Sequence, residues 1–375
     1  MSGRGETHRA AIFIDNPVFG RAAWNALHPL AFSRQQAVRD MVEAMGWIEQ
    51  SELRECPIAT PETLARFHAP DYIAALQAAV ARGKVTAEER TRYGFGTMEN
   101  PIFPGLFERA AATVGGSIAA ARVALQGHIA FHPAGGTHHG KPDRASGFCY
   151  FNDPAFAIAT FLDAALDRVL YLDLDAHHGD GVEAIFAGDS RVHTLSLHEA
   201  GRWPHSGTPD NPGPANATNF AVPRAINDAE YDWLIQGPVA EVAGRFAPQA
   251  IVVTAGVDCL HGDPLSAMEL SNRALWRAVE CALGWAPHIA VLGGGGYNPW
   301  TVTRGWAGMW AVLSGRDPGE VPNEAARALL AGFESDLIDE DEIEPEWLDS
   351  VADAPRPGPI RADVMHCAQA ALERR

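Results

Sequence analysis

The sequence predicts an α/β fold in which helices flank a central parallel sheet. Short, continuously apolar segments alternate along the chain with longer segments of helical periodicity, a pattern typical of a parallel sheet covered on both faces. Clusters of polar residues directly follow four of the apolar segments. Because the ligand sites of such sheets lie beyond the carboxyl ends of the strands, we expect a functional site at that edge.

The expected elements follow from hydrophobic periodicity and from helix-start signals. We expect strands at residues 11–14, 128–131, 169–172, 192–197, 250–254 and 289–292. We expect helices at residues 34–47, 61–67, 71–82, 110–125, 154–165, 229–245 and 272–283. Residues 199–219 are rich in Gly, Pro and Asn, so we expect a long surface loop that forms a functional rim or lid.

Composition and charge narrow the class of protein. The chain has 375 residues and a formal net charge of -18, which argues against general nucleic-acid binding. Five scattered cysteines and the lack of an apolar signal segment favour reduced thiols in a cytoplasmic protein. No apolar stretch reaches the roughly 18 residues that span a membrane. We expect one domain over 1–375, with a core at 10–315 and an acidic segment, 334–353, that is a solvated surface or a mobile tail.

The strongest polar cluster is Asp173, Asp175 and His177, in a segment that directly follows the expected strand at 169–172. Side chains alternate between the faces of a strand, so we expect these three to point the same way. Zinc accepts both imidazole nitrogen and carboxylate oxygen, and the cluster therefore indicates a divalent-metal site. The alternative is a helix cap beside core histidines, but charged groups so close to a buried strand are costly without a metal or partner.

Two further clusters could complete that site. His138 and His139 end an expected strand among glycines, and each needs a carboxylate to set its tautomer and basicity. Asp173 and Asp180 are available for that task. Asp258 follows another expected strand and is either a turn residue or a third metal ligand, which would leave one position for water as in catalytic zinc sites.

A fourth cluster is the glycine run at 293–296 with Tyr297 after it. It fits neither common phosphate-binding pattern, because no Gly-Lys-Ser/Thr follows and G-x-G-x-x-G is not met. We interpret it as a mobile loop that brings Tyr297 into the site, where the hydroxyl could donate to a developing oxyanion. The alternative is a tyrosine buried under a flexible loop.

Taken together, these stretches resemble the histone deacetylase family. The segments GGTHHGKPDRASGFCYFND, VLYLDLDAHHGDGVE, SLH, GVDCLHGDP and GGGGYN occur in the order and at the separations typical of that family, over residues 10–315. GG-x-HH and GGGGYN are most similar to the class I and acetoin-utilisation branch. The resemblance implies a single arginase-like α/β domain.

The resemblance also implies roles for individual residues. The metal ligands fall on Asp175, His177 and Asp258. The histidine pair falls on His138 and His139, with Asp173 and Asp180 as partners, and the transition-state tyrosine falls on Tyr297. The acyl-lysine channel falls on Gly147 and Phe148, with Trp203 on the opposite wall. A structural monovalent-cation site, usually for potassium, falls near Asp173, Asp175, His177, Ser196 and Leu197, and Arg34 matches an arginine of an internal cavity. The family's rim aspartate aligns with Glu99, a departure that leaves recognition of a peptide backbone open.

The activity that the resemblance implies is metal-dependent removal of acetyl or other acyl groups from lysine side chains or small acylated amines. We expect one Zn²⁺ per chain, with Fe²⁺ as an alternative because this ligand set suits several divalent metals. Alternative functions are an acetylpolyamine amidohydrolase, a ureohydrolase-like two-metal enzyme and a non-catalytic acyl-amine sensor. Expected partners are an acylated lysine peptide or protein or a small acylated amine, with no nucleic acid and no membrane. The sequence leaves the oligomeric state open, a homo-oligomer included.

Overall fold

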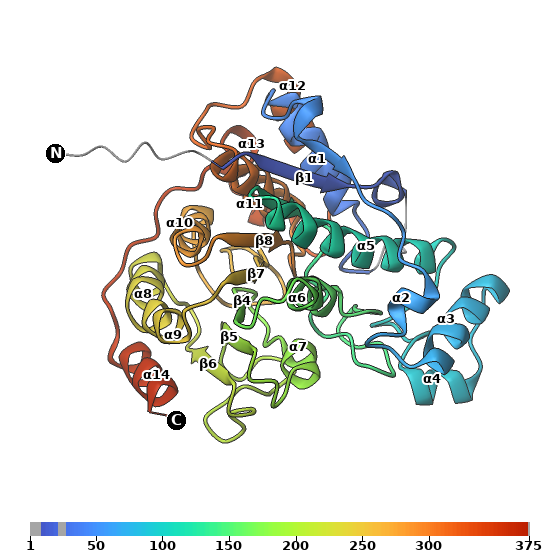
Figure 1. Ribbon diagram of the computed structural model, residues 1–375. Coiled ribbons are helices and arrows are strands. Elements are labelled where there is room, and N and C mark those ends of the chain that lie inside the picture. The colour runs from blue at the N-terminus through green and yellow to red at the C-terminus, as the bar shows by residue number, and fades with distance from the viewer. Residues whose placement is uncertain (1–8, 22–27, 374–375) are drawn as a thin grey trace.

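The fold is built on one parallel sheet. The computed structural model describes residues 9–21 and 28–373 (Figure 1), whose strands form a single eight-stranded sheet in the order β2-β1-β3-β8-β7-β4-β5-β6. All its pairings are parallel, so the predicted fold class is confirmed. The strands are β1 (Ala11–Asp15), β2 (Leu53–Glu55), β3 (Ile129–His132), β4 (Val169–Asp173), β5 (Val192–Glu199), β6 (Ala217–Val222), β7 (Ala250–Thr254) and β8 (His288–Leu292).

Helices cover both faces of the sheet because its strands alternate between two apolar cores. Phe13 and Leu172 belong to one core, whereas the residues that directly precede them, Ile12 and Tyr171, belong to the other. The first core is covered by α1 (Arg34–Ala44), α8 (Asp228–Leu234), α9 (Ala240–Phe246), α10 (Asn272–Leu283) and α11 (Pro299–Leu313). The second is covered by α5 (Leu106–Leu125), α6 (Asp153–Asp163) and α7 (Asp180–Ile185), which lie on the other side of the sheet in Figure 1.

Smaller helices lie around this three-layer centre. A third apolar cluster packs α3 (Pro70–Arg82) and α4 (Ala87–Tyr93) beside α5, next to α2 (Pro61–Leu64). Thr60 caps α2, since its side chain accepts a hydrogen bond from the Thr63 amide. The C-terminal part of the chain contains α12 (Glu324–Ala331), α13 (Glu346–Asp349) and α14 (Ala362–Leu372), and α14 lies beside β6.

Two predicted segments differ from the structure. The expected helix at 229–245 is interrupted by a π-helical turn, Ile235–Val239, which contains Pro238. Proline has no N–H to donate, and the wider turn accommodates that loss between α8 and α9. The expected loop at 199–219 is shorter than predicted, because its last residues begin β6, the edge strand beside β5.

The acidic C-terminal segment is attached to the core. Its residues Asp339–Glu342 are exposed, as predicted for a solvated surface. Trp347, however, is only 3 % exposed and stacks on Trp300 with ring centroids 6.2 Å apart. Asp353 accepts a hydrogen bond of 2.6 Å from the buried Arg304. The alternative prediction of a tail is therefore wrong, because apolar burial and a buried ion pair fix the second half of the segment.

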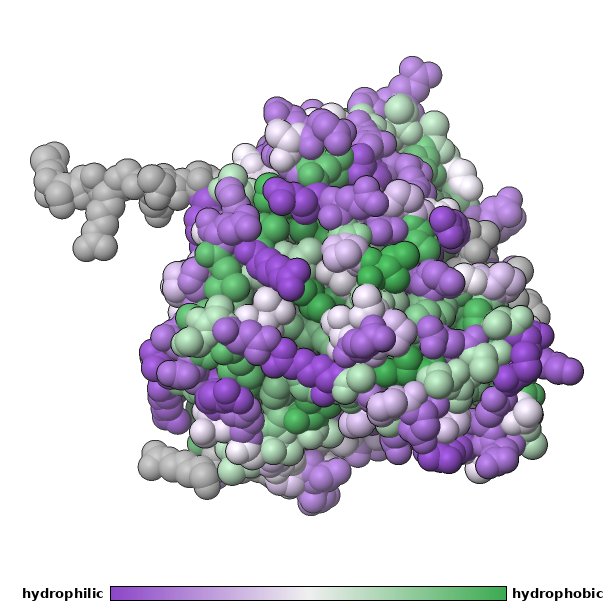
Figure 2. Space-filling view, turned by 45° about the vertical axis from the view of Figure 1, so that its right-hand side comes forward, coloured by the Kyte–Doolittle hydropathy of each residue, from purple (hydrophilic) through white to green (hydrophobic). Residues whose placement is uncertain are grey.

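Among the helices of the described residues, none combines the length and the apolar character needed to cross a bilayer. The face shown in Figure 2 mixes hydrophilic and hydrophobic residues over its whole area.

Candidate active site

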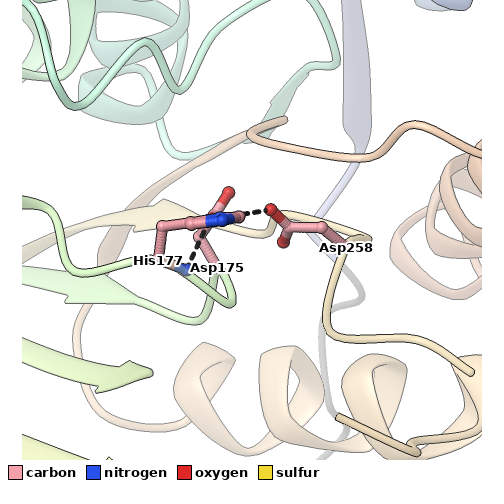
Figure 3. A group of neighbouring side chains, drawn as sticks. All are labelled: Asp175, His177 and Asp258. Carbon is pink, nitrogen blue, oxygen red and sulfur yellow. Dashed lines mark hydrogen bonds and ion pairs between the residues drawn. The ribbon is translucent and has the colours of Figure 1, made fainter. Parts of the chain in front are cut away.

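Three potential metal ligands converge beyond the ends of two adjacent strands. Asp175 and His177 follow β4, and Asp258 follows β7, its neighbour in the sheet. One ligand atom from each lies within 4.8 Å of the other two, and all three residues are buried (Figure 3). The sequence therefore identified a group of side chains that the fold does bring together.

The convergence has a different cause from the one predicted. β4 ends at Asp173, so strand alternation does not reach Asp175 or His177. Instead, the Asp173 carboxylate accepts a hydrogen bond from the Asp175 amide (3.2 Å), and the Asp175 carboxylate accepts one from the His177 amide (2.9 Å). Two successive turns of this aspartate type direct the side chains into the site.

The electrostatics of these residues favour a bound cation. Nδ1 of His177 lies 2.9 Å from Oδ2 of Asp258 and 3.3 Å from Oδ1 of Asp175. Burial alone would lower the pKa of His177, but the two carboxylates outweigh it and raise this pKa well above its usual value. Burial and the Asp175 charge raise the pKa of Asp258. Two buried carboxylates thus need a positive charge between them, and their oxygens with one imidazole nitrogen suit a divalent metal.

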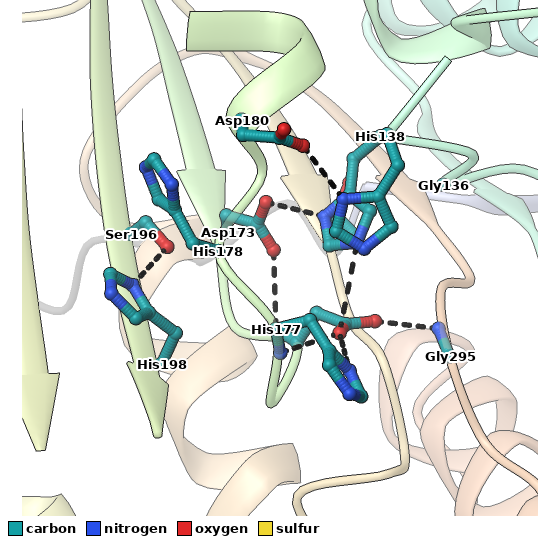
Figure 4. Close-up of polar contacts among 12 residues, drawn as sticks. Gly136, His138, Asp173, His177, His178, Asp180, Ser196, His198 and Gly295 are labelled. Atoms are coloured by element: carbon teal, nitrogen blue, oxygen red, sulfur yellow. Dashed lines mark hydrogen bonds and ion pairs between the residues drawn. The ribbon is translucent and has the colours of Figure 1, made fainter. Parts of the chain in front are cut away.

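The two adjacent histidines each contact a different aspartate (Figure 4). His138 follows β3, and its Nδ1 lies 2.7 Å from Oδ2 of Asp173. His139 has its Nδ1 2.8 Å from Oδ1 of Asp180, which also forms an ion pair with Lys141. Asp180 is the first residue of α7. The predicted pairing of each histidine with its own aspartate agrees with this geometry.

The two imidazoles have opposite charge preferences. Burial would lower the pKa of His138, but the charges of Asp173 and Asp175 outweigh it and raise this pKa to about 9. For His139, burial and the neighbouring charge of His138 lower the pKa to about 3, despite the hydrogen bond with Asp180. These pKa directions favour a charged His138 and a neutral His139 near neutral pH.

The glycine-rich loop after β8 holds Tyr297 in the site. The Gly295 amide donates to Asp175 (2.6 Å), and the Tyr297 amide donates to Asp263 (2.7 Å). A Cβ on Gly295 would lie 2.0 Å from Oδ2 of Asp258, so a side chain there would occupy the metal-ligand site. Burial and the charge of Asp258 raise the pKa of Tyr297 well above its usual value, which keeps its hydroxyl protonated.

Arg34 holds the same loop through hydrogen bonds to its backbone. Its guanidinium donates to the carbonyls of Gly294 (2.9 Å) and Gly296 (3.2 Å). A cavity of about 90 Å³ is lined by Arg34 and Arg109 together with His138 and Tyr297. Arg34 thus lines a cavity next to His138 and Tyr297, and its match to the arginine of the family's internal cavity stays a prediction.

A pocket leads from the surface to these residues between two aromatic side chains. It has a volume of about 440 Å³ and is lined by Phe148 and Trp203 as well as by His139, His177 and Tyr297. The ring centroid of Trp203 lies 4.6 Å from that of His139, and the ring centroid of Phe148 lies 5.7 Å from that of Tyr297.

Gly147 provides the space between the two aromatic walls. A Cβ on this residue would lie 2.5 Å from the Trp203 ring. The predicted channel residues Gly147, Phe148 and Trp203 are therefore brought together around one pocket.

The remaining predicted residues lie near this centre. Glu99 is exposed at the pocket mouth, where its Oε1 accepts a hydrogen bond of 2.6 Å from the Gly147 amide. Ser196 and Leu197 lie on β5, where Ser196 is in register with Asp173. Both are buried, and the Ser196 hydroxyl contacts Nδ1 of His198 at 2.9 Å. Their role in holding a monovalent cation stays a prediction.

Sequence reasoning missed two aspartates that position the site. The carboxylate of Asp153 accepts hydrogen bonds from the amides of Gly136 (3.0 Å) and Thr137 (2.7 Å), and so fixes the segment that carries the histidine pair. Asp263 holds the Tyr297 loop, as described above. Each lies inside a polar motif of the sequence, but a motif does not reveal which distant amide its carboxylate will meet.

Comparison with known proteins agrees with this geometry. A family model described as the histone deacetylase domain matches residues 28–313. The chain belongs to the histone deacetylase family. The resemblance of the sequence motifs to this family is thereby confirmed. Membership of the family indicates a hydrolase that removes acetyl groups.

Individual members of the histone deacetylase family match most of the chain. The acetoin utilization protein AcuC of Bacillus subtilis is 36% identical over 336 residues, which cover 84% of this chain and 85% of AcuC. Histone deacetylase 1 of Homo sapiens is 33% identical over 331 residues, which cover 86% of this chain and 67% of that protein. The crystal structure of a histone deacetylase homologue from Aquifex aeolicus has a TM-score of 0.91 at 32% identity, covering 97% of this chain and 100% of the other. A structure of such a homologue complexed with SAHA matches with the same TM-score and identity.

Proposed function

We propose that this deacetylase is a metal-dependent amidohydrolase that removes acetyl or other acyl groups from lysine side chains or small acylated amines. One observation carries the proposal. The candidate metal ligand His177, the neutral imidazole of His139 and the hydroxyl-bearing Tyr297 all line a single pocket that opens to the surface. A polarising ion, a base and an oxyanion donor are the three components that metal-assisted amide hydrolysis needs.

Asp175, His177 and Asp258 would hold the metal. When bound, a divalent ion supplies Lewis acidity that polarises the acyl carbonyl and lowers the pKa of a water molecule. We favour Zn²⁺, one per chain, with Fe²⁺ as the alternative that the same ligand set accommodates. Structural K⁺ near Asp173, Asp175, His177, Ser196 and Leu197 is part of the same proposal.

The protein residues would divide the remaining work. His139, neutral and oriented by Asp180, accepts a proton from the attacking water and later donates it to the leaving amine. His138, charged and held by Asp173, stabilises negative charge beside the reacting carbon. The Tyr297 hydroxyl donates a hydrogen bond to the carbonyl oxygen as it becomes an oxyanion. Phe148 and Trp203 would enclose the alkyl chain of the substrate between their rings.

The alternatives are less well supported. Among the residues that the structure describes, Asp175, His177 and Asp258 are the one group of three or more potential metal ligands, which counts against a two-metal ureohydrolase. A non-catalytic sensor would not need a neutral base and an oxyanion donor beside the same metal. An acetylpolyamine amidohydrolase would use the same chemistry and differs only in its substrate. A cytoplasmic location belongs to the proposal and is supported by the scattered cysteines.

The test is acetate release by the purified protein. Acetyl-lysine peptides, peptides with longer acyl groups and N-acetylated polyamines are incubated with the protein, and both products are quantified by NMR. We expect one acetate and one free amine per turnover, with activity lost on chelation and restored by a divalent metal. Urea formation from guanidino substrates, or tight binding without turnover of any acylated amine, would contradict the proposal.

A further inference from the structure

An arginine, Arg202, lies at the mouth of the active-site pocket. Arg202 lines the same pocket as His139, His177 and Tyr297, and its side chain is 29% exposed. It directly precedes Trp203, the aromatic wall of the channel. Arg202 thus lies beside the path of any substrate, although none of the chemistry described above involves it.

A buried glutamate holds the Arg202 guanidinium in place. Glu199, at the end of β5, is only 2% exposed, and it accepts hydrogen bonds from Nε (2.9 Å) and Nη2 (2.8 Å) of Arg202. Such a two-point contact fixes the plane of the guanidinium. Oε2 of Glu199 also accepts a hydrogen bond of 2.8 Å from the Ala267 amide, in the segment that contributes Pro264 and Leu265 to the pocket. Glu199 therefore holds both Arg202 and the segment that contains Pro264 and Leu265.

The charge of Arg202 is not cancelled by this arrangement. Glu199 has a second arginine nearby, Arg224, whose Nε is 3.8 Å from its carboxylate. Two guanidinium groups therefore face one carboxylate. Within the part of the chain that the structure describes, Nη1 of Arg202 has no hydrogen-bond partner, so it can donate at the mouth.

The mouth also offers an acceptor. Glu99 lines the pocket, and one of its oxygens accepts the Gly147 amide at 2.6 Å. Its other oxygen, Oε2, has no hydrogen-bond partner among the described residues. A substrate that enters the channel therefore meets both an immobilised donor, on Arg202, and a free acceptor, on Glu99.

We propose that Arg202 makes the mouth selective for an acylated lysine within a polypeptide and against acylated polyamines. The inference rests on the proposed function and names its substrate class. A polypeptide has carbonyl oxygens and amide N–H groups where the lysine side chain joins the backbone, and these match the Arg202 donor and the Glu99 acceptor. The ammonium groups of a polyamine can bind Glu99, but they offer Arg202 no acceptor and are repelled by its charge, so Arg202 is the residue that discriminates against the polyamine.

The experiment compares kcat/KM for an acetyl-lysine peptide with kcat/KM for an N-acetylated polyamine. We expect the wild-type enzyme to favour the peptide by about tenfold or more, and Arg202→Gln to reduce that ratio by about tenfold, the size of one charged hydrogen bond. The change should come from KM for the peptide, because Arg202 does not touch the reacting atoms. Arg202→Lys keeps the charge and should keep discrimination against the polyamine while it loses part of the peptide affinity.

The matched control is Arg245→Gln, which removes a guanidinium on α9 that is 54% exposed and does not line the pocket. It should leave the ratio unchanged. A wild-type preference for the polyamine, or equal losses for both substrates in Arg202→Gln, would overturn the inference while the deacylase chemistry stands. If the wild-type enzyme hydrolyses neither substrate, the proposed function fails. Binding of the two substrates then tests the role of Arg202 separately. Tighter binding of the peptide than of the polyamine, lost in Arg202→Gln, would support that role, and equal binding would overturn it.

Discussion

Two histidines that are neighbours in the sequence occupy contrasting environments. His138 contacts Asp173, which is fully buried at the end of β4, and its Nε2 lies 3.7 Å from Asp175. His139 contacts Asp180, whose side chain is 17% exposed and also forms an ion pair with Lys141. The same residue type is therefore stabilised as a cation in one position and as a neutral base in the next.

The pKa directions of the two histidines differ because each has a different second charged neighbour. Both imidazoles have one aspartate at hydrogen-bond distance and both are buried. His138 also faces Asp175, whereas His139 faces the positive charge of His138 itself, and Lys141 offsets the charge of Asp180. Protonation of one histidine thus opposes protonation of the other.

Alanine substitutions should separate the two histidines most strongly. We expect His139→Ala to lower kcat by roughly 10²–10⁴-fold on an acetyl-lysine substrate, the usual contribution of a general base and acid. His138→Ala should cost less, because it removes charge stabilisation and leaves proton transfer intact. Steady-state kcat values for the two variants, each with its metal content verified, make the comparison.

A second substrate sharpens that result. With an acetyl ester of a phenol, the leaving group needs less protonation, so the gap between the two variants should narrow. Equal losses on both substrates, or a larger loss for His138→Ala, would mean that the two roles are reversed.

Tyr297→Phe should give the next largest effect. Loss of one oxyanion donor is expected to lower kcat by roughly 10²–10³-fold with little change in KM. Because the hydroxyl acts on the carbonyl oxygen, this loss should be similar for the amide and the ester, in contrast to the loss for His139→Ala. An unchanged kcat at saturating substrate would exclude this role for Tyr297.

Asp180→Asn should have a smaller effect that is specific to His139. The amide no longer fixes the His139 tautomer, and we expect a loss in kcat of roughly 10–100-fold, the usual cost of removing such a partner. Lys141→Gln, which retains the Asp180 contact to His139, serves as the control and should change kcat much less. Comparable losses in both variants would show that kcat depends on the net charge around His139 and not on its contact with Asp180.

A pH titration of the metal-free protein should show the contrast without any effect of turnover. The ring signals of His138 should titrate near pH 9 and those of His139 near pH 3, as seen by NMR of protein labelled at histidine. The raised pKa of His138 also predicts that its contribution to the free energy of unfolding is complete below about pH 6.5 and is lost as the pH rises through about 9. Titration of both rings together near pH 6.5 would remove the basis for distinct roles.

The sequence predicts the centre of this molecule better than its edges. Six strands were expected from apolar runs, and all six are present, whereas the edge strands β2 and β6 were missed. β6 alternates between buried and partly exposed residues and begins within a segment rich in turn-forming residues. The helix α11 also escaped prediction, because it is buried on nearly all sides and has no polar face to create a helical period.

The site could be predicted as a set of residues but not as a geometry. Polar clusters at strand ends identify Asp175, His177 and Asp258 because parallel strands share one functional edge. The turns that aim Asp175 and His177, and the contact of Asp263 with the Tyr297 amide, depend on backbone positions that no local pattern specifies. The opposite pKa directions of His138 and His139 depend on charges brought together from several segments, which the sequence alone does not place.

Metal titration tests the central assignment most directly. We expect the metal-free protein to be inactive and its deacetylase activity to rise linearly with added divalent metal, levelling off at one equivalent per chain. Asp258→Ala should bind no ion at that concentration, whereas Asp143→Ala, which removes an exposed carboxylate outside the triad, should bind one and retain activity. Full activity in the metal-free protein, or metal retention with full activity in Asp258→Ala, would contradict the account.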